Sequence, residues 1–145
     1  MIDLDLTGRN AIVTGASMGI GAATVRLLTD HGATVAFCAR GQDAVDELAA
    51  YGDTTRGYVA DMSDADSTNA FLERATADMG DVDILVNNVG ASPSRNFLYM
   101  DDADWEQLFQ LNMMSAVRCT RYVLPRMRAQ QWGRIVMIST VGALY

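Results

Sequence analysis

Glycines at positions 15, 19 and 21 give this sequence its clearest chemical signal. They lie in the run Thr14-Gly15-Ala16-Ser17-Met18-Gly19-Ile20-Gly21, which follows the apolar residues 11–13 and opens an amphipathic helical pattern. Gly15 permits a tight turn, Gly19 lets backbone approach a phosphate, and Gly21 lets helix and strand pack closely. The start of the helix then offers unpaired N–H groups to an anion. The spacing predicts a dinucleotide pyrophosphate site, and an ordinary strand-to-helix turn is the structural alternative.

Short apolar runs alternate with helical patterns along the chain, which indicates βαβ units and a parallel sheet buried on both faces. Five strands are predicted, over residues 10–13, 34–39, 55–60, 84–87 and 134–138. Right-handed crossovers with one reversal imply the strand order 3-2-1-4-5. Ligands bind at the reversal point of such sheets, here between the first and fourth strands. The Gly15 turn and the loop Asn87-Asn88-Val89-Gly90 are therefore expected to face one crevice.

Helices are predicted between the strands, over residues 19–30 and 42–50, from residue 63 onward, and over 102–130. The first is expected to turn one face toward the sheet, with Ala22, Ala23, Val25, Leu27 and Leu28 inward. The third is expected to open with a capping-box-like start over residues 63–66. Pro125 is expected to kink or break the longest helix. His31, at the end of the first helix, receives no catalytic role.

The composition fits one globular domain over residues 1–145, because half of the 145 residues are hydrophobic. The formal net charge is -7 and the 11 basic residues are scattered, so no nucleic-acid partner is expected. Cys38 and Cys119 have neither CxxC spacing nor histidine partners, which favours core positions over a disulfide or a metal site. The N-terminus lacks a basic leader pattern, and no apolar run approaches the roughly 20 residues of a membrane span. We expect no membrane partner and a cytoplasmic location.

Four motifs follow one another on the predicted elements. They are the glycine run of residues 14–21, Asp61 after the third strand, Asn87-Asn88-x-Gly90 after the fourth, and Asn112 in the long helix. Together they resemble the classical short-chain dehydrogenases/reductases over nearly the whole chain. The resemblance implies a Rossmann-type α/β fold. It also implies an oxidoreductase that moves a hydride between a nicotinamide cofactor and a carbonyl or alcohol, similar to a 3-oxoacyl reductase.

The resemblance implies binding roles as well. The pyrophosphate would be held by the glycine-rich turn, through Gly15, Ser17, Met18, Gly19, Ile20 and Gly21. Asp61 and the Met62 backbone would hold adenine, while Asn88 and Gly90 would stabilise the central strand and the ribose region. Each of these residues also has a structural alternative as a turn or cap residue, and Asp61 alone would more simply open a helix.

The residues at the end of the second predicted strand indicate whether NAD(H) or NADP(H) is the cofactor. An acidic side chain there would bind the ribose hydroxyls of NAD, but the position is Ala39. The next residue, Arg40, has a guanidinium that could pair with a 2′-phosphate, so NADP(H) is favoured over NAD(H). Many NADP-dependent relatives carry a second basic residue at the position of Met18, and this chain does not. A solvated arginine is the alternative for Arg40.

Three polar residues match the catalytic pattern of the family in part. Asn112 corresponds to the asparagine that holds a helix distortion and a water in the proton relay, although a buried asparagine could merely satisfy backbone groups. Thr140 corresponds to the catalytic serine, and its extra methyl group restricts its side chain. Ser139 is the fallback, which requires a register shift of one residue and would place its side chain on the opposite face of the strand.

The tyrosine and lysine of the family's Tyr-x-x-x-Lys motif are not among these residues. Tyr145 comes too soon after Thr140, and the sequence contains no lysine. We therefore expect the cofactor-binding part of a reductase, without the last strands and the substrate loop. A short nucleotide-binding protein without redox chemistry, or one half of a split enzyme, are the other interpretations. Residues 91–96 provide only one wall of a substrate site, so the sequence does not predict the identity of the substrate.

The long helix also bears on assembly. Met113, Met114, Val117 and Val123 are apolar residues that belong either to the core or to the helix-to-helix interface common in the family. A homo-oligomer, dimer or tetramer, is expected for the full-length form.

Overall fold

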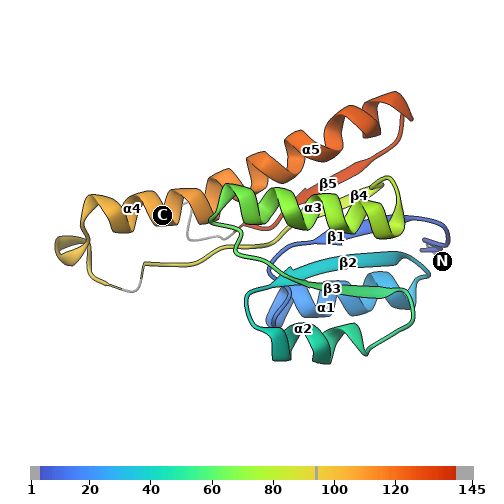
Figure 1. Cartoon of the computed structure of the whole chain (residues 1–145), viewed down its shortest axis with the longest axis horizontal. Helices are drawn as coiled ribbons and strands as arrows, with labels where there is room; N and C mark the ends of the chain where they lie inside the picture. Colours follow the sequence, from blue (N-terminus) through green and yellow to red (C-terminus); the bar gives the residue numbers. More distant parts are fainter. Residues whose placement is uncertain (1–3, 94, 140–145) are drawn as a thin grey trace.

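A five-stranded parallel sheet forms the centre of the molecule (Figure 1). The structure is a computed structural model that describes residues 4–93 and 95–139. The strands are β1 (Asn10–Val13), β2 (Thr34–Ala39), β3 (Thr55–Val59), β4 (Ile84–Asn87) and β5 (Arg134–Met137). Their order is β3-β2-β1-β4-β5, which confirms the predicted doubly wound arrangement. Strands β3 and β5 each end one residue before the predicted boundary.

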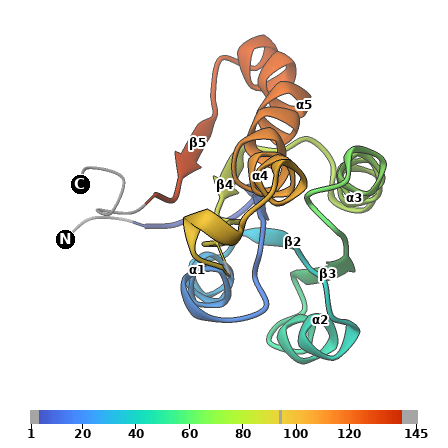
Figure 2. The ribbon, with the colours of Figure 1, turned by 90° about the vertical axis from the view of Figure 1, so that its left-hand side faces the viewer.

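Helices cover both faces of the sheet (Figure 2). The helical elements are α1 (Gly19–Asp30), α2 (Gln42–Ala49), α3 (Ala65–Met79), η1 (Phe97–Tyr99), α4 (Asp102–Phe109), η2 (Gln110–Met114) and α5 (Ser115–Ala129). Helices α1 and α2 lie on one face, and α3 and α5 lie on the other. This layering explains the nearly continuous apolar character of β1, β2 and β4, since a strand with helices on both sides has no solvent-facing side chains. The edge strands β3 and β5 keep exposed side chains, so the prediction that they too are buried on both faces is wrong.

Alternate residues of β1 show how the two cores form. Ile12 points to the side where Leu72 of α3 packs, and Val13 points to the side where Val25 of α1 packs. None of these four side chains retains exposed surface. Because the side-chain period of a strand is two, each central strand contributes to both cores. This packing fixes the ends of the strands, from which the loops of the site emerge.

Helix α1 buries a narrower face than predicted. Ala22 and Val25 are buried and Leu28 is half-buried, as expected, but Ala23 is exposed and Leu27 is 56% exposed. A single stripe of small residues therefore faces the sheet, and the prediction for Ala23 and Leu27 is wrong. Small side chains let the start of α1 lie close to β1, which positions the glycine-rich turn.

The helix starts also differ in detail from the prediction. Asp64 caps α3 by accepting a hydrogen bond from the Ser67 N–H at 2.7 Å, so the predicted capping box over residues 63–66 is wrong. The capping box of the described chain lies at α4, where Asp101 and Asp104 each accept from the other's backbone N–H. The Asp101-x-x-Asp104 spacing carries the same signal, with aspartate in place of the usual glutamate.

The long helix is interrupted around Asn112, where the resemblance implied a distortion, and not at Pro125. It changes to a π-helix, η2, between α4 and α5, while Pro125 lies within α5 without ending it. Proline removes one backbone hydrogen bond, and both Pro125 and Arg121 are exposed, so water can reach the carbonyl that loses its partner. Helix α4 projects beyond the sheet (Figure 1) and buries none of its residues.

Both cysteines are core residues, as predicted. Cys38 and Cys119 are free, fully buried and part of the same apolar cluster, and burial raises the pKa of each thiol to about 12. Among the described residues, no group of acidic, histidine or cysteine side chains is arranged to hold a metal ion. Within that same part of the chain, no helix has the length and apolar character that crossing a membrane requires.

Candidate functional site

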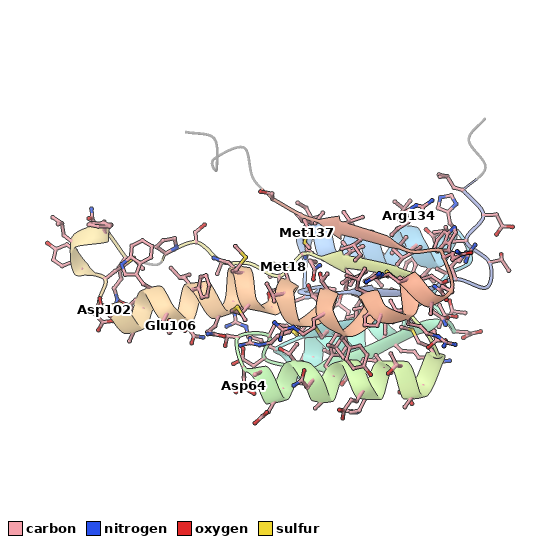
Figure 3. The ribbon with its side chains drawn as sticks, turned by 90° about the horizontal axis from the view of Figure 1, so that it is seen from above. Met18, Asp64, Asp102, Glu106, Arg134 and Met137 are labelled. Atoms are coloured by element: carbon pink, nitrogen blue, oxygen red, sulfur yellow. The ribbon has the colours of Figure 1, made fainter. Side chains whose placement is uncertain are left out.

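A cavity of about 270 Å³ lies at the carboxyl ends of the strands, where β1 and β4 are neighbours. It is lined by Gly15, Ser17, Met18, Cys38, Ala39, Arg40, Ala60, Met62, Asn88, Val89, Gly90, Ala91 and Leu111. The glycine-rich turn and the loop after β4 thus face one crevice, as the strand order implied. Figure 3 shows Met18 at the same end of the sheet as Met137, the last residue of β5, while Arg134 marks the opposite end.

Two glycines of the turn are fixed by geometry. Gly15 has a φ of +68°, and a Cβ on it would lie 2.9 Å from the Val89 Cα. A Cβ on Gly21 would overlap the Gly15 carbonyl oxygen and lie 2.5 Å from the Asn88 Nδ2. Only glycine allows the turn, the helix and the loop after β4 to approach so closely. Gly19 also has a positive φ, of 58°, with open space around it.

The start of α1 is prepared for an anion. Met18 is the N-cap residue, and its side chain makes no capping hydrogen bond. The first turn of α1 contains no acidic residue. The N–H groups at this end and the positive end of the helix dipole are thus available to a bound phosphate. Met18 and Ile20 are 76% and 62% exposed, so neither side chain is used by the core.

A hydrogen-bond network joins the two loops of the cavity. The buried Thr14 hydroxyl accepts from the backbone N–H groups of Asn88 and Val89, both at 3.1 Å. The Asn88 Nδ2 donates to the carbonyl oxygens of Thr14 at 3.1 Å and Gly15 at 2.9 Å. Asn88 therefore stabilises the turn directly. Thr14 was not among the predicted site residues, although its position between an apolar strand and Gly15 was the available signal.

The adenine-binding residues predicted after β3 separate into two environments. Met62 is 2% exposed and lines the cavity, whereas Asp61 does not line it. The Asp61 Oδ1 accepts from the Ser63 hydroxyl at 2.7 Å and the Ser63 N–H at 2.9 Å. These two hydrogen bonds, with a smaller effect of the Arg40 charge, hold the pKa of Asp61 below its ordinary value. The carboxylate is thus ionised and fixed in a turn at the edge of the site.

Arg40 extends from the end of β2 into the cavity lining. It is exposed and has no hydrogen bond or ion pair with any residue that the structure describes. The preceding Ala39 is buried and offers no acceptor for ribose hydroxyls. Its charge has only a minor effect on Asp61. An exposed guanidinium beside a cavity suits a phosphate, because it can donate two parallel hydrogen bonds.

Asn112 lies in the π-helix η2, at the helix distortion that the resemblance implied. Its Oδ1 accepts from the Ala91 N–H at 2.7 Å, and its Nδ2 donates to the Ala91 carbonyl at 2.9 Å. The side chain is exposed rather than buried, and Asn112 does not line the cavity, whereas the preceding Leu111 does. Asn112 therefore ties the long helix to the loop after β4.

The remaining predicted residues lie at the edge of the site or outside the described chain. Gly19, Ile20 and Gly21 belong to the turn but do not line the cavity. Ser139 is exposed and follows β5 at the same end of the sheet, and Ile138 before it donates to the Asn87 carbonyl at 2.9 Å. Thr140 lies outside the described residues.

Some lining residues were found only in the structure. Cys38, Ala60, Val89 and Leu111 are apolar side chains whose types carry no chemical signal, and they meet because three strand ends and η2 converge. They give the cavity flat apolar walls beside the polar turn, which suits a base or sugar ring.

A doubly wound sheet whose glycine-rich turn and uncapped helix start meet at the reversal point is the arrangement of α/β proteins that suits a nucleotide. Residues 9–145 match the family model described as short chain dehydrogenase, and the chain belongs to that family.

Known relatives extend this assignment. The chain is 41% identical to the uncharacterized oxidoreductase YvrD of Bacillus subtilis (strain 168) over 143 residues, which cover 96% of this chain and 54% of that protein. It is 33% identical over 139 residues to the 3-oxoacyl-[acyl-carrier-protein] reductase FabG of Escherichia coli (strain K12). That match covers 95% of this chain and 57% of FabG. The chain also superposes, with a TM-score of 0.87 and 31% identity, on the crystal structure of a protein assigned as a short-chain alcohol dehydrogenase from Sinorhizobium meliloti 1021. The superposition covers 97% of this chain and 57% of that protein. The chain spans about half the length of these relatives.

Proposed function

We propose that this chain is the cofactor-binding domain, residues 1–145, of an NADP(H)-dependent carbonyl reductase. The observation that carries the proposal is the cavity at the reversal point of the sheet, which both predicted loops line. An uncapped helix start suits the pyrophosphate, and apolar walls suit the adenosine moiety.

Each part of the cofactor has a group of residues that suits it. The turn through Gly15, Ser17, Met18, Gly19, Ile20 and Gly21 would hold the pyrophosphate. Asp61 and Met62 would hold adenine, Asn88 and Gly90 would support the ribose region, and Arg40 would pair with the 2′-phosphate. The exposed guanidinium at Arg40 and the absence of an acid at Ala39 favour NADP(H) over NAD(H). When bound, the cofactor supplies or accepts the hydride.

The chain's own polar residues would position the second reactant. A hydroxyl at Thr140, or at Ser139 if the strand register differs, can donate a hydrogen bond to a carbonyl oxygen and orient it. Asn112 would keep the loop after β4 in place by its two hydrogen bonds to Ala91. Proton delivery to the developing alkoxide needs a general acid, which is a tyrosine in the family.

A 3-oxoacyl thioester is the substrate class that we favour among carbonyl compounds. The relatives named 3-oxoacyl-[acyl-carrier-protein] reductase support this choice, at 33% to 34% identity. The test is the loss of NADPH absorbance in the presence of a short 3-oxoacyl thioester, with the protein expressed from its complete reading frame. We expect turnover that Thr140→Val removes and Ser139→Ala largely preserves, with NADPH binding unchanged in both. Binding without turnover of any carbonyl compound would contradict the reductase and favour a nucleotide-binding module or half of a split enzyme.

Helix α4 supports a homo-oligomer. Trp105 and Phe109 lie four residues apart on α4 and are 44% and 51% exposed. The start of α4 is acidic, with Asp101, Asp102, Asp104 and Glu106, while α5 is basic, with Arg118, Arg121, Arg126 and Arg128. Two copies packed antiparallel along these helices would place acidic ends beside basic ends and cover the aromatic side chains. We therefore propose a dimer through α4 and α5.

A further inference from the structure

A second cavity adjoins the first on the side of the loop after β4. It has a volume of about 270 Å³ and is lined by Arg40, Ala91, Ser92, Pro93, Arg95, Met100, Asp104, Gln107, Leu108 and Leu111. Three of these residues, Arg40, Ala91 and Leu111, also line the cavity at the glycine-rich turn. The two cavities therefore meet at Arg40, at the end of β2.

Two guanidinium groups line this second cavity, and each interacts only weakly with a carboxylate, Arg40 with Asp61 and Arg95 with Asp104. Arg40 has no ion pair within the described part of the chain. Arg95 lies 3.5 Å from Asp104, and its side chain is 61% exposed, so this contact is long and screened by solvent. The same Asp104 oxygen also accepts the Asp101 N–H in the α4 capping box. Two arginines and one carboxylate, Asp104, line this cavity, and that balance of charge favours an anion there.

The glycine-rich turn supplies no cation of its own. Met18 occupies the turn position that lines the first cavity, and its side chain is uncharged. A phosphate that reaches Arg40 would therefore meet a single positive charge, unless a second one comes from outside the turn. Arg95 is the other arginine that lines the second cavity, and it stands on the loop that joins β4 to α4.

We infer that Arg95 is a second cofactor-specificity residue, which holds the 2′-phosphate of NADP(H) together with Arg40 where the two cavities meet. The inference rests on the proposed function, since it assigns a ligand to the edge of the same site. Arg95 exchanges its weak contact with Asp104 for a charge-assisted hydrogen bond to the phosphate, while Asp104 keeps its capping role. Specificity is then divided between the end of β2 and the loop after β4.

Two nucleotides separate this inference from the proposed function. Adenosine 2′,5′-bisphosphate carries the 2′-phosphate and 5′-AMP lacks it, so the ratio of their dissociation constants by titration calorimetry isolates that group. We expect the unchanged protein to prefer the bisphosphate. Arg95→Ala should lower this preference roughly tenfold with 5′-AMP affinity unchanged. Arg56→Ala removes the same charge from an exposed position on β3 that lines neither cavity, and should leave the preference intact.

Asp104→Asn gives a result that a merely structural role would not produce. Asparagine can still accept the Asp101 N–H, but it no longer competes for Arg95 or repels a phosphate. The preference for the bisphosphate should therefore rise, by roughly threefold. A lower or unchanged preference in this variant would contradict the assigned pairing.

The remaining outcomes are distinct. If Arg40→Ala abolishes the preference and Arg95→Ala does not change it, the inference is wrong and the proposed cofactor site stands. If the unchanged protein binds both nucleotides equally, neither arginine binds a 2′-phosphate and the inference is wrong. If it binds neither nucleotide, the proposed function itself fails.

Discussion

At the scale of single residues, the site depends on positions where one extra atom is not tolerated. Gly21 lies against the Gly15 carbonyl and the Asn88 side chain, and Thr14 joins the same groups by hydrogen bonds. The glycines were predictable because their spacing falls between an apolar strand and an amphipathic helical pattern. Thr14 was not, since a threonine after a strand has no distinctive chemistry until its partners from β4 are known.

Gly21→Ala should destabilise the fold by about 1–3 kcal/mol, because its methyl group has no room between the turn and Asn88. Chemical denaturation measures the free energy of unfolding. Gly41→Ala is the matched control, because nothing lies within 4 Å of a Cβ there and its φ is negative. Equal stability of the two variants would contradict the close packing described here.

The Asp61 turn gives a prediction about pH. Its lowered pKa means that the carboxylate favours the folded state above the ordinary pKa, and that this contribution is lost as the pH falls through the lowered value. Ser63→Ala removes the hydroxyl donor, so the pKa of Asp61, measured by NMR titration, should rise toward its ordinary value. An unchanged pKa would show that the Ser63 hydroxyl does not stabilise the carboxylate. Because Asp61 stays ionised at neutral pH in both proteins, Ser63→Ala should leave cofactor affinity unchanged at neutral pH.

At the scale of elements, the strands follow closely from the sequence and the long helix does not. Apolar runs bounded by glycine and asparagine specify where strands end, so the strand order and the crevice were predictable. The proline rule assigned an interruption to Pro125, whereas the helix is interrupted at residues 110–114, around the Asn112 at which the resemblance implied a distortion. The hydrogen bonds of Asn112 could not be predicted, because its partner Ala91 comes from a different element. The second cavity could not be predicted either, because Arg40 and Arg95 come from different elements and line one cavity only in the folded chain.

The link between η2 and the loop after β4 can be tested at Asn112. Asn112→Leu removes both hydrogen bonds to Ala91 and should weaken NADPH binding roughly tenfold, because Ala91 lines the cavity. Hydrogen exchange at the Ala91 N–H should accelerate in parallel. Asn112→Asp keeps the acceptor for that N–H, so its NADPH affinity and its exchange rate should lie between those of the wild-type protein and of Asn112→Leu. Unchanged exchange in Asn112→Leu would rule out the proposed positioning role.

At the scale of the whole molecule, helices cover both faces of the central strands, β5 stays largely exposed at the edge of the sheet, and α4 projects past the carboxyl ends of the strands. Figure 3 shows Asp102 and Glu106 on this projecting helix. The cofactor cavity and the exposed aromatic side chains of α4 therefore lie toward the same end. Assembly through α4 would then fix the loop after β4, which carries Ala91 and Arg95.

The proposed dimer predicts a specific weakness. Trp105→Ala should raise the dimer dissociation constant at least roughly tenfold, because aromatic anchors dominate such interfaces. Leu27→Ala, which changes an exposed apolar residue on α1, should have no effect. Sedimentation equilibrium distinguishes the two variants. A wild-type protein that is monomeric at all concentrations would overturn the proposed assembly.

The central claim is that the crevice between β1 and β4 binds NADP(H). The most direct test is a calorimetric titration of the wild-type protein, expressed from its complete reading frame, with NADPH and with NADH. We expect one NADPH bound per chain, roughly tenfold tighter than NADH because of the charge-assisted contacts at the 2′-phosphate. Absence of binding by either dinucleotide would contradict the claim, and tighter binding of NADH would contradict the role given to Arg40.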